Sequence, residues 1–88
     1  MELNWQSESI IAHSEIMAHN YWHFTGRTLV PDVADAREMA QRIYEASFVV
    51  VSHGTEADPV LNYGNATALA LWEMSWEELT QTPSRLTA

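Results

Sequence analysis

Three histidines in one segment are the first residues whose types and spacing could do chemistry. His19 and His23 lie one helical turn apart, a spacing that can hold a metal ion, and His13 precedes them in the same segment. Glu15 shares the His19 side, but neither a Glu-x-x-His nor a His-Glu-x-x-His motif is present. We interpret the histidines as a solvated helix face or as packing beside Trp22, and we predict no metal site. His19 and His23 are kept as weak candidate ligands of a metal-dependent enzyme.

A second polar group, His53 with Glu56 and Asp58, has the residue types for acid–base catalysis. No nucleophile is arranged with these side chains. The segment also contains Gly54 and Pro59, which are typical of tight turns for backbone reasons. We favour a structural turn here, and predict that the chain is not an enzyme.

An apolar ligand pocket is the other chemistry that the residues suggest. Aromatic side chains recur through the second half of the sequence, and such side chains line many small-molecule sites. Aromatic residues at this spacing also form ordinary hydrophobic cores, so both interpretations stay open. The candidate pocket residues are Phe48, Val50, Tyr63, Asn65, Trp72 and Trp76.

The charge of the chain argues against two classes of binding partner. The 88 residues contain 12 acids and 4 basic residues, all arginine, for a net charge of −8. Such a surface repels nucleic-acid phosphates and anionic lipids, so we predict neither as a partner. No cysteine is present, which removes disulfides and thiolate metal sites and fits a reducing compartment. With no signal peptide or membrane-length apolar run visible, we expect a cytoplasmic protein.

Two helices are expected to position the histidine segment. Apolar residues at helical spacing predict a first helix over about 7–24, with Ser7 or Ser9 as its cap and Gly26 after its end. A second amphipathic helix is expected to begin near Asp32 and to end near residues 45–46. An i,i+4 ion pair between Glu38 and Arg42 should support it.

The pattern changes to strands after the second helix. Phe48–Val51 is β-branched and aromatic, which predicts a strand buried on at least one face. Val60–Tyr63 predicts a second strand, and the short connection favours an antiparallel hairpin. The charge-free first run is also prone to aggregation if it is left exposed, so we expect another element to cover it.

Two short helices should follow the hairpin. Asn65 is a good N-cap for the first of them, which carries Ala and Leu on its buried side. Ser75 with Glu78 three residues later forms a capping box that starts the second. Thr82 and Pro83 should end the segment. The predicted class is therefore α+β: two N-terminal helices, an antiparallel β-hairpin and two short helices.

This order of elements resembles the front half of a PAS domain, where a Tyr and an Asn open one helix and Ser-x-Glu-Glu-Leu announces the next. The segments 48–59, 61–65 and 83–88 resemble signature blocks of the MEKHLA family, a PAS-like domain. The segment 22–26 resembles the end of the N-terminal helix in bacterial members. The likeness covers nearly the whole chain.

The resemblance implies a non-enzymatic sensory or protein-interaction module. PAS-like domains bind small molecules between their sheet and helices, and two copies commonly associate through an N-terminal helix. The resemblance identifies no cofactor. A PAS-like sheet has five strands and this sequence supplies two, so we expect 1–88 to be a single, truncated domain with an incomplete sheet. Residues 1–46 would be a helical extension and 47–88 the start of the PAS-like core.

We expect this chain to form a homo-oligomer, most simply a dimer, through the strands, the first helix or both, because a lone hairpin with an open edge is only marginally stable. A small apolar ligand is the further expectation from the resemblance. The alternative is a purely structural dimerisation domain with a filled core and no ligand pocket.

Overall fold

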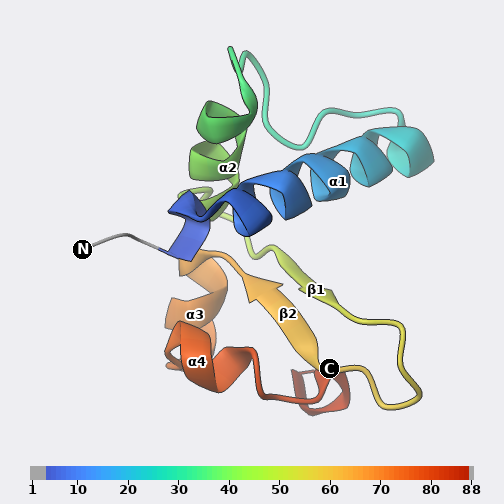
Figure 1. Cartoon of the computed structure of the whole chain (residues 1–88), viewed down its shortest axis with the longest axis vertical. Helices are drawn as coiled ribbons and strands as arrows, with labels where there is room; N and C mark the ends of the chain where they lie inside the picture. Colours follow the sequence, from blue (N-terminus) through green and yellow to red (C-terminus); the bar gives the residue numbers. More distant parts are fainter. Residues whose placement is uncertain (1–3, 88) are drawn as a thin grey trace. The chain divides into compact units, whose positions relative to one another are not determined.

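The computed structural model describes residues 4–87, which fold as two compact units that divide between Ile43 and Tyr44. The predicted α+β class with an incomplete, two-stranded antiparallel sheet is confirmed. Figure 1 shows the elements along the chain. They are the 3-10 helix η1 (Asn4–Gln6), α1 (Glu8–Thr25), α2 (Ala36–Tyr44), β1 (Val51–His53), β2 (Leu61–Gly64), α3 (Ala66–Trp72), α4 (Trp76–Leu79) and the 3-10 helix η2 (Ser84–Thr87).

Helix α1 begins and ends at the residues that the sequence indicates. The Ser7 side chain accepts a hydrogen bond from the amide of Ile10, which satisfies one of the unpaired donors of the first turn. At the other end Gly26 has a left-handed φ of 71°, and its amide donates to the carbonyl of Trp22 at 2.8 Å. This conformation costs little only for glycine, so the helix ends there.

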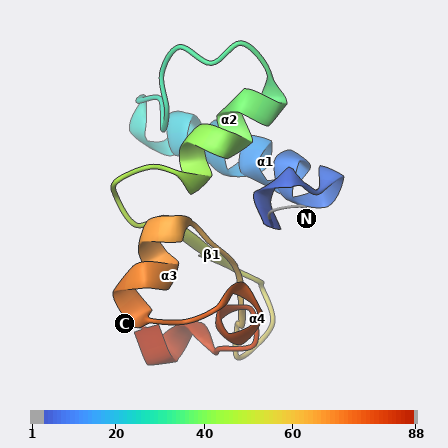
Figure 2. The same cartoon turned by 90° about the vertical axis from the view of Figure 1, so that its left-hand side faces the viewer.

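Helix α2 begins four residues later than predicted. Asp32, the expected start, has a left-handed φ of 57° and lies in the loop. Asp35 accepts a hydrogen bond from the amide of Glu38 at 2.8 Å and so takes the capping role. The predicted ion pair is confirmed, with Arg42 Nη2 at 3.1 Å from Glu38 Oε1. A long loop joins the end of α1 to the start of α2 (Figure 2).

The core of the first unit combines a tryptophan with residues of the two helices. Trp5 is buried, and the Arg37 guanidinium lies 5.5 Å from the centroid of its ring. Ala40 and Ile43 of α2 are completely buried. Ser14 of α1 is also completely buried, and its hydroxyl donates to the carbonyl of Ile10 at 2.8 Å, so this polar group is satisfied within its own helix.

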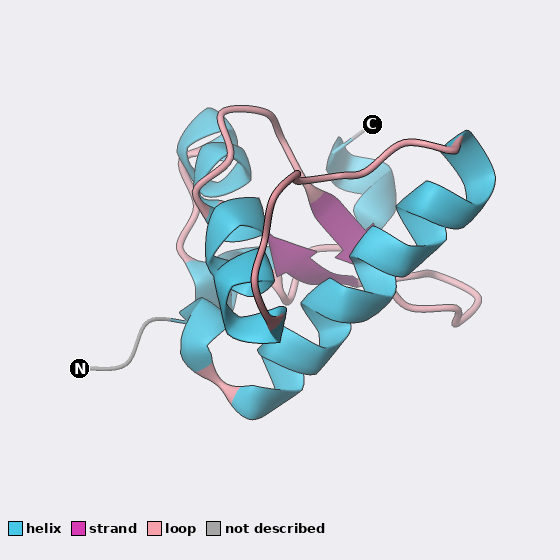
Figure 3. Cartoon of the chain, turned by 90° about the horizontal axis from the view of Figure 1, so that it is seen from above, coloured by secondary structure: helices cyan, strands magenta, loops and turns pink. Residues whose placement is uncertain are grey.

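The predicted antiparallel hairpin is confirmed, but its first strand is shifted. Strand β1 is Val51–His53, and Phe48–Val50 precedes it outside the sheet. Figure 3 shows the two paired strands in magenta. The cause is a side chain distant in sequence, because Asn65 bonds the amide of Val50 and the carbonyl of Phe48. These backbone groups are therefore not available to a strand partner.

The expected cover of this apolar run is not observed in the structure. Phe48, Val49 and Val51 are 46%, 40% and 38% exposed, respectively. The prediction of a buried first strand is thus wrong for these three side chains, whereas Val50 between them is partly buried.

Strand β2 is the centre of the second unit, because it has neighbours on both sides. One edge pairs with β1, and on the other side Val60 forms a bridge with Pro83. The amide of Leu61 donates to the carbonyl of Thr82 at 2.9 Å. The segment after α4 therefore runs beside β2, a pairing that the sequence analysis does not anticipate.

Helices α3 and α4 pack beside β2 (Figure 1) and bury its inward residues. Leu61 and Tyr63 are buried while Asn62 between them is exposed, which is the alternation of a strand with one covered face. Leu79 of α4 is completely buried against Gly64, where an added Cβ would lie 2.8 Å from Leu79 Cδ1. The predicted capping box of Ser75 and Glu78 is confirmed at the start of α4.

Candidate functional site

Among the six candidate pocket residues, Asn65 has a polar side chain that forms several hydrogen bonds. It is completely buried, and its Oδ1 accepts hydrogen bonds from the amides of Val50 at 3.0 Å and Ala68 at 3.1 Å. Its Nδ2 donates to the carbonyl of Phe48 at 2.8 Å. The side chain thus caps α3, as predicted, and also fixes the segment before β1.

The aromatic candidates divide between the core and the surface. Tyr63 is completely buried and meets Trp76 edge to face, with ring centroids 5.5 Å apart. Trp76 and Trp72 are partly buried, and Phe48 is exposed. The structure therefore joins Tyr63 to Trp76 and joins Asn65 to the Phe48–Val50 backbone. That the six residues line a ligand pocket stays a prediction.

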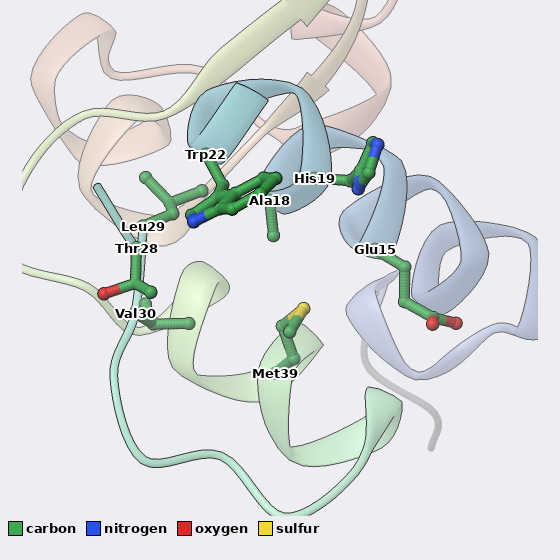
Figure 4. A pocket seen from close by; sticks show the side chains of 8 residues that line it. All are labelled: Glu15, Ala18, His19, Trp22, Thr28, Leu29, Val30 and Met39. Atoms are coloured by element: carbon green, nitrogen blue, oxygen red, sulfur yellow. The ribbon is translucent and has the colours of Figure 1, made fainter. Parts of the chain in front are cut away.

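A groove in the first unit was not anticipated from the sequence. Its volume is about 260 Å³, and it lies between α1, the loop that follows and α2 (Figure 4). Three segments separated in the sequence contribute to it. Its lining residues are Glu15, Ala18, His19, Trp22, Thr28, Leu29, Val30 and Met39.

The groove has a polar end and an apolar end. Figure 4 shows Glu15 and His19 on one side and Leu29 and Val30 on the other, with the Trp22 ring facing Met39 across the space between them. The Trp22 side chain is 55% exposed. The arrangement offers a flat aromatic surface and a nearby carboxylate.

The sequence contained one signal for this groove. Glu15, Ala18, His19 and Trp22 recur at the i, i+3, i+4, i+7 spacing of a single helix face. The pattern identifies the face but gives no partner for it. The loop residues and Met39 come to it only through the tertiary fold.

The histidines have aromatic neighbours. The rings of His19 and His23 are stacked with centroids 6.5 Å apart, and His23 meets Phe24 edge to face at 4.9 Å. Within residues 4–87, no three His, Asp or Glu side chains are grouped so that they could hold a metal ion. Partial burial lowers the pKa of His13 below its ordinary value, because desolvation disfavours the charged imidazole.

The residues of the predicted turn make separate contacts. His53 Nδ1 lies 2.7 Å from the Gly54 carbonyl, and Glu56 accepts a hydrogen bond from the amide of Val60 at 2.8 Å. Asp58 pairs with Arg85 at 3.2 Å. These contacts hold the connection between the strands and do not bring the three side chains to one another.

Comparison with protein families matches residues 11–88 to the MEKHLA domain. Comparisons with curated proteins and with solved structures give no match. Across the described residues, no helix has the length and apolar character needed to span a bilayer.

Proposed function

The chain belongs to the MEKHLA family of PAS-like sensory domains, and from this we propose that it acts as a non-enzymatic interaction module that pairs with a second copy of itself. The family is not a family of enzymes. In this proposal, residues 47–88 are the start of the PAS-like core and 1–46 a helical extension of the same domain.

The observation that carries the proposal is the open edge of β1 with its exposed apolar side chains. Strand β2 has neighbours on both sides, whereas β1 pairs with β2 alone among the described strands. Phe48, Val49 and Val51 are exposed beside that edge. A strand at the edge of a sheet and flanked by apolar side chains readily pairs with another chain, because the pairing adds backbone hydrogen bonds and removes apolar surface from water.

Net charge gives this pairing a distinctive salt dependence. Each copy carries a formal charge of −8, so two copies repel one another over a distance of about 10 Å at ordinary ionic strength. Added salt screens this repulsion and leaves apolar contact intact. We therefore expect the dimer to become tighter as salt is raised.

Sedimentation velocity over a wide range of protein concentration tests the proposal. Wild-type protein should form a dimer, while Val49→Lys and Val51→Lys should each shift the equilibrium toward monomer, because a lysine in an edge strand or directly beside it opposes pairing. Leu71→Lys is the matched control, since Leu71 is 62% exposed on α3 and lies outside the edge. Monomeric wild-type protein at high concentration, or equal loss of dimer in Leu71→Lys, contradicts the proposal.

Helix α1 offers a second surface through which two copies could associate, and a separate variant tests it. Ile16 and Phe24 are 56% and 80% exposed on this helix. If α1 forms the interface, Ile16→Lys weakens the dimer while Val49→Lys leaves it unchanged. The two lysine variants therefore separate association through the strand from association through the helix.

We also propose that the PAS-like core holds a small apolar ligand beside Phe48, Val50 and Trp72. The competing function is purely structural dimerisation with a filled core, and the complete burial of Tyr63 and Asn65 favours it. Native mass spectrometry of protein as purified from cells distinguishes the two. A retained small molecule supports sensing, and the bare mass of the chain supports the structural function.

A further inference from the structure

The groove of the first unit contains none of the six candidate pocket residues and has the size of a small-molecule site. Its volume of about 260 Å³ lies just below the roughly 300–1,000 Å³ of sites for drug-sized ligands. A molecule of one ring and a short chain would fill it. The groove is formed within Met1–Ile43, so binding there does not depend on self-association through β1.

The apolar part of the groove is suited to a flat hydrocarbon body. The Trp22 ring is more than half exposed and faces Met39, while Leu29 and Val30 close one end (Figure 4). Indole and thioether groups both make favourable contacts with aromatic rings. A ligand between Trp22 and Met39 would remove this exposed apolar surface from water.

The polar part of the groove selects the charge of the ligand. Glu15 is the single charged carboxylate among the lining residues, and these include no Lys or Arg. The net charge of −8 adds a negative field that disfavours anions. Charge complementarity therefore points to a cationic ligand.

We propose that this groove binds a small organic amine, with the ammonium group at Glu15 and the apolar body between Trp22 and Met39. Glu15 and Trp22 are seven residues apart on α1, which is roughly 10 Å along the helix axis. An aromatic ring joined to an amine by a short alkyl chain spans this distance. Phenylbutylamine is the simplest probe of that class.

The test uses wild-type protein and three probes that differ in charge: phenylbutylamine, the neutral phenylbutanol and the anionic phenylbutyrate. Binding is followed by NMR, through the Met39 methyl signal and the indole N–H of Trp22. The proposal expects phenylbutylamine to shift both signals and to bind more tightly than either other probe. Equal or tighter binding of phenylbutyrate overturns it, as does titration with the amine without a shift at Met39.

Variants of exposed residues then locate the two ends of the ligand. Glu15→Gln should weaken amine binding about two- to fivefold, the range of an exposed ion pair, and leave phenylbutanol unaffected. Trp22→Leu should weaken both by about fivefold, because both probes pack their phenyl ring against the indole. Glu8→Gln, on the same helix but outside the groove, is the matched control. Equal affinity in Glu15→Gln and Glu8→Gln overturns the proposal, and amide spectra confirm that each variant is folded.

Discussion

Replacing Asn65 with alanine removes a side chain that joins helix α3 to the segment before β1. The change eliminates the bonds from the amides of Val50 and Ala68 and the bond to the carbonyl of Phe48. Loss of the helix cap costs about 1 kcal/mol. Each of the two remaining bonds contributes about 1 kcal/mol, and more where a buried partner stays unpaired. We expect the free energy of unfolding to fall by about 2–4 kcal/mol.

Ser75→Ala is the matched control, because Ser75 caps α4 at an exposed position and its side chain accepts from the amide of Glu78 in the same turn. Its expected cost is about 1 kcal/mol. Urea denaturation followed by circular dichroism measures both variants. Hydrogen exchange of the Val50 and Ala68 amides then reports whether protection is lost at the two places that Asn65 joins.

Asn65→Asp separates the cap from the bond to Phe48. Aspartate keeps both acceptor contacts but places a carboxylate against the Phe48 carbonyl in a completely buried position. Burial should raise the pKa of this carboxyl in the folded state above its unfolded value of about 3.9. The variant should therefore approach wild-type stability near pH 4 and lose stability as pH rises. An Asn65→Ala cost no larger than that of Ser75→Ala would refute the reasoning.

Two further predictions concern packing and pH. Gly64→Ala should lower the free energy of unfolding by about 1–3 kcal/mol, since its Cβ would overlap Leu79 Cδ1. In a Leu79→Ala background the same change should cost less, and a double-mutant cycle by urea denaturation that shows simple additivity contradicts the contact. Wild-type stability should fall as pH drops through about 6.5 and below, since burial lowers the pKa of His13 and the unfolded state then binds more protons. His13→Gln should show a smaller fall over the same range, and an equal fall would show that another group is responsible.

The features predicted well from the sequence are those that neighbouring residues determine. Ser7 and Gly26 bound α1, and Ser75 with Glu78 starts α4, because caps act on amides and carbonyls within a single turn. The start of α2 is predicted wrongly because two residues of the same type could cap it. Asp32 and Asp35 are equivalent in residue type, and only the backbone conformation shows that Asp35 is the cap.

The features missed depend on residues distant in sequence. Asn65 bonds the backbone at Phe48 and Val50, which moves the start of β1, and no local pattern contains that information. The contact of Thr82 with Leu61 likewise forms only in the folded chain. The groove is of the same kind, because Met39 completes a surface that α1 presents. Helical spacing places the four α1 residues of the groove on one face, but it carries no information on the residues opposite them.

Sedimentation velocity of wild-type protein beside Val49→Lys tests the central claim most directly. If the open edge of β1 is the interaction surface, wild-type protein sediments as a dimer at high concentration, the dimer strengthens with salt, and Val49→Lys stays monomeric under the same conditions. Wild-type protein that is monomeric throughout, or a Val49→Lys variant that dimerises as tightly as wild type, would contradict the account.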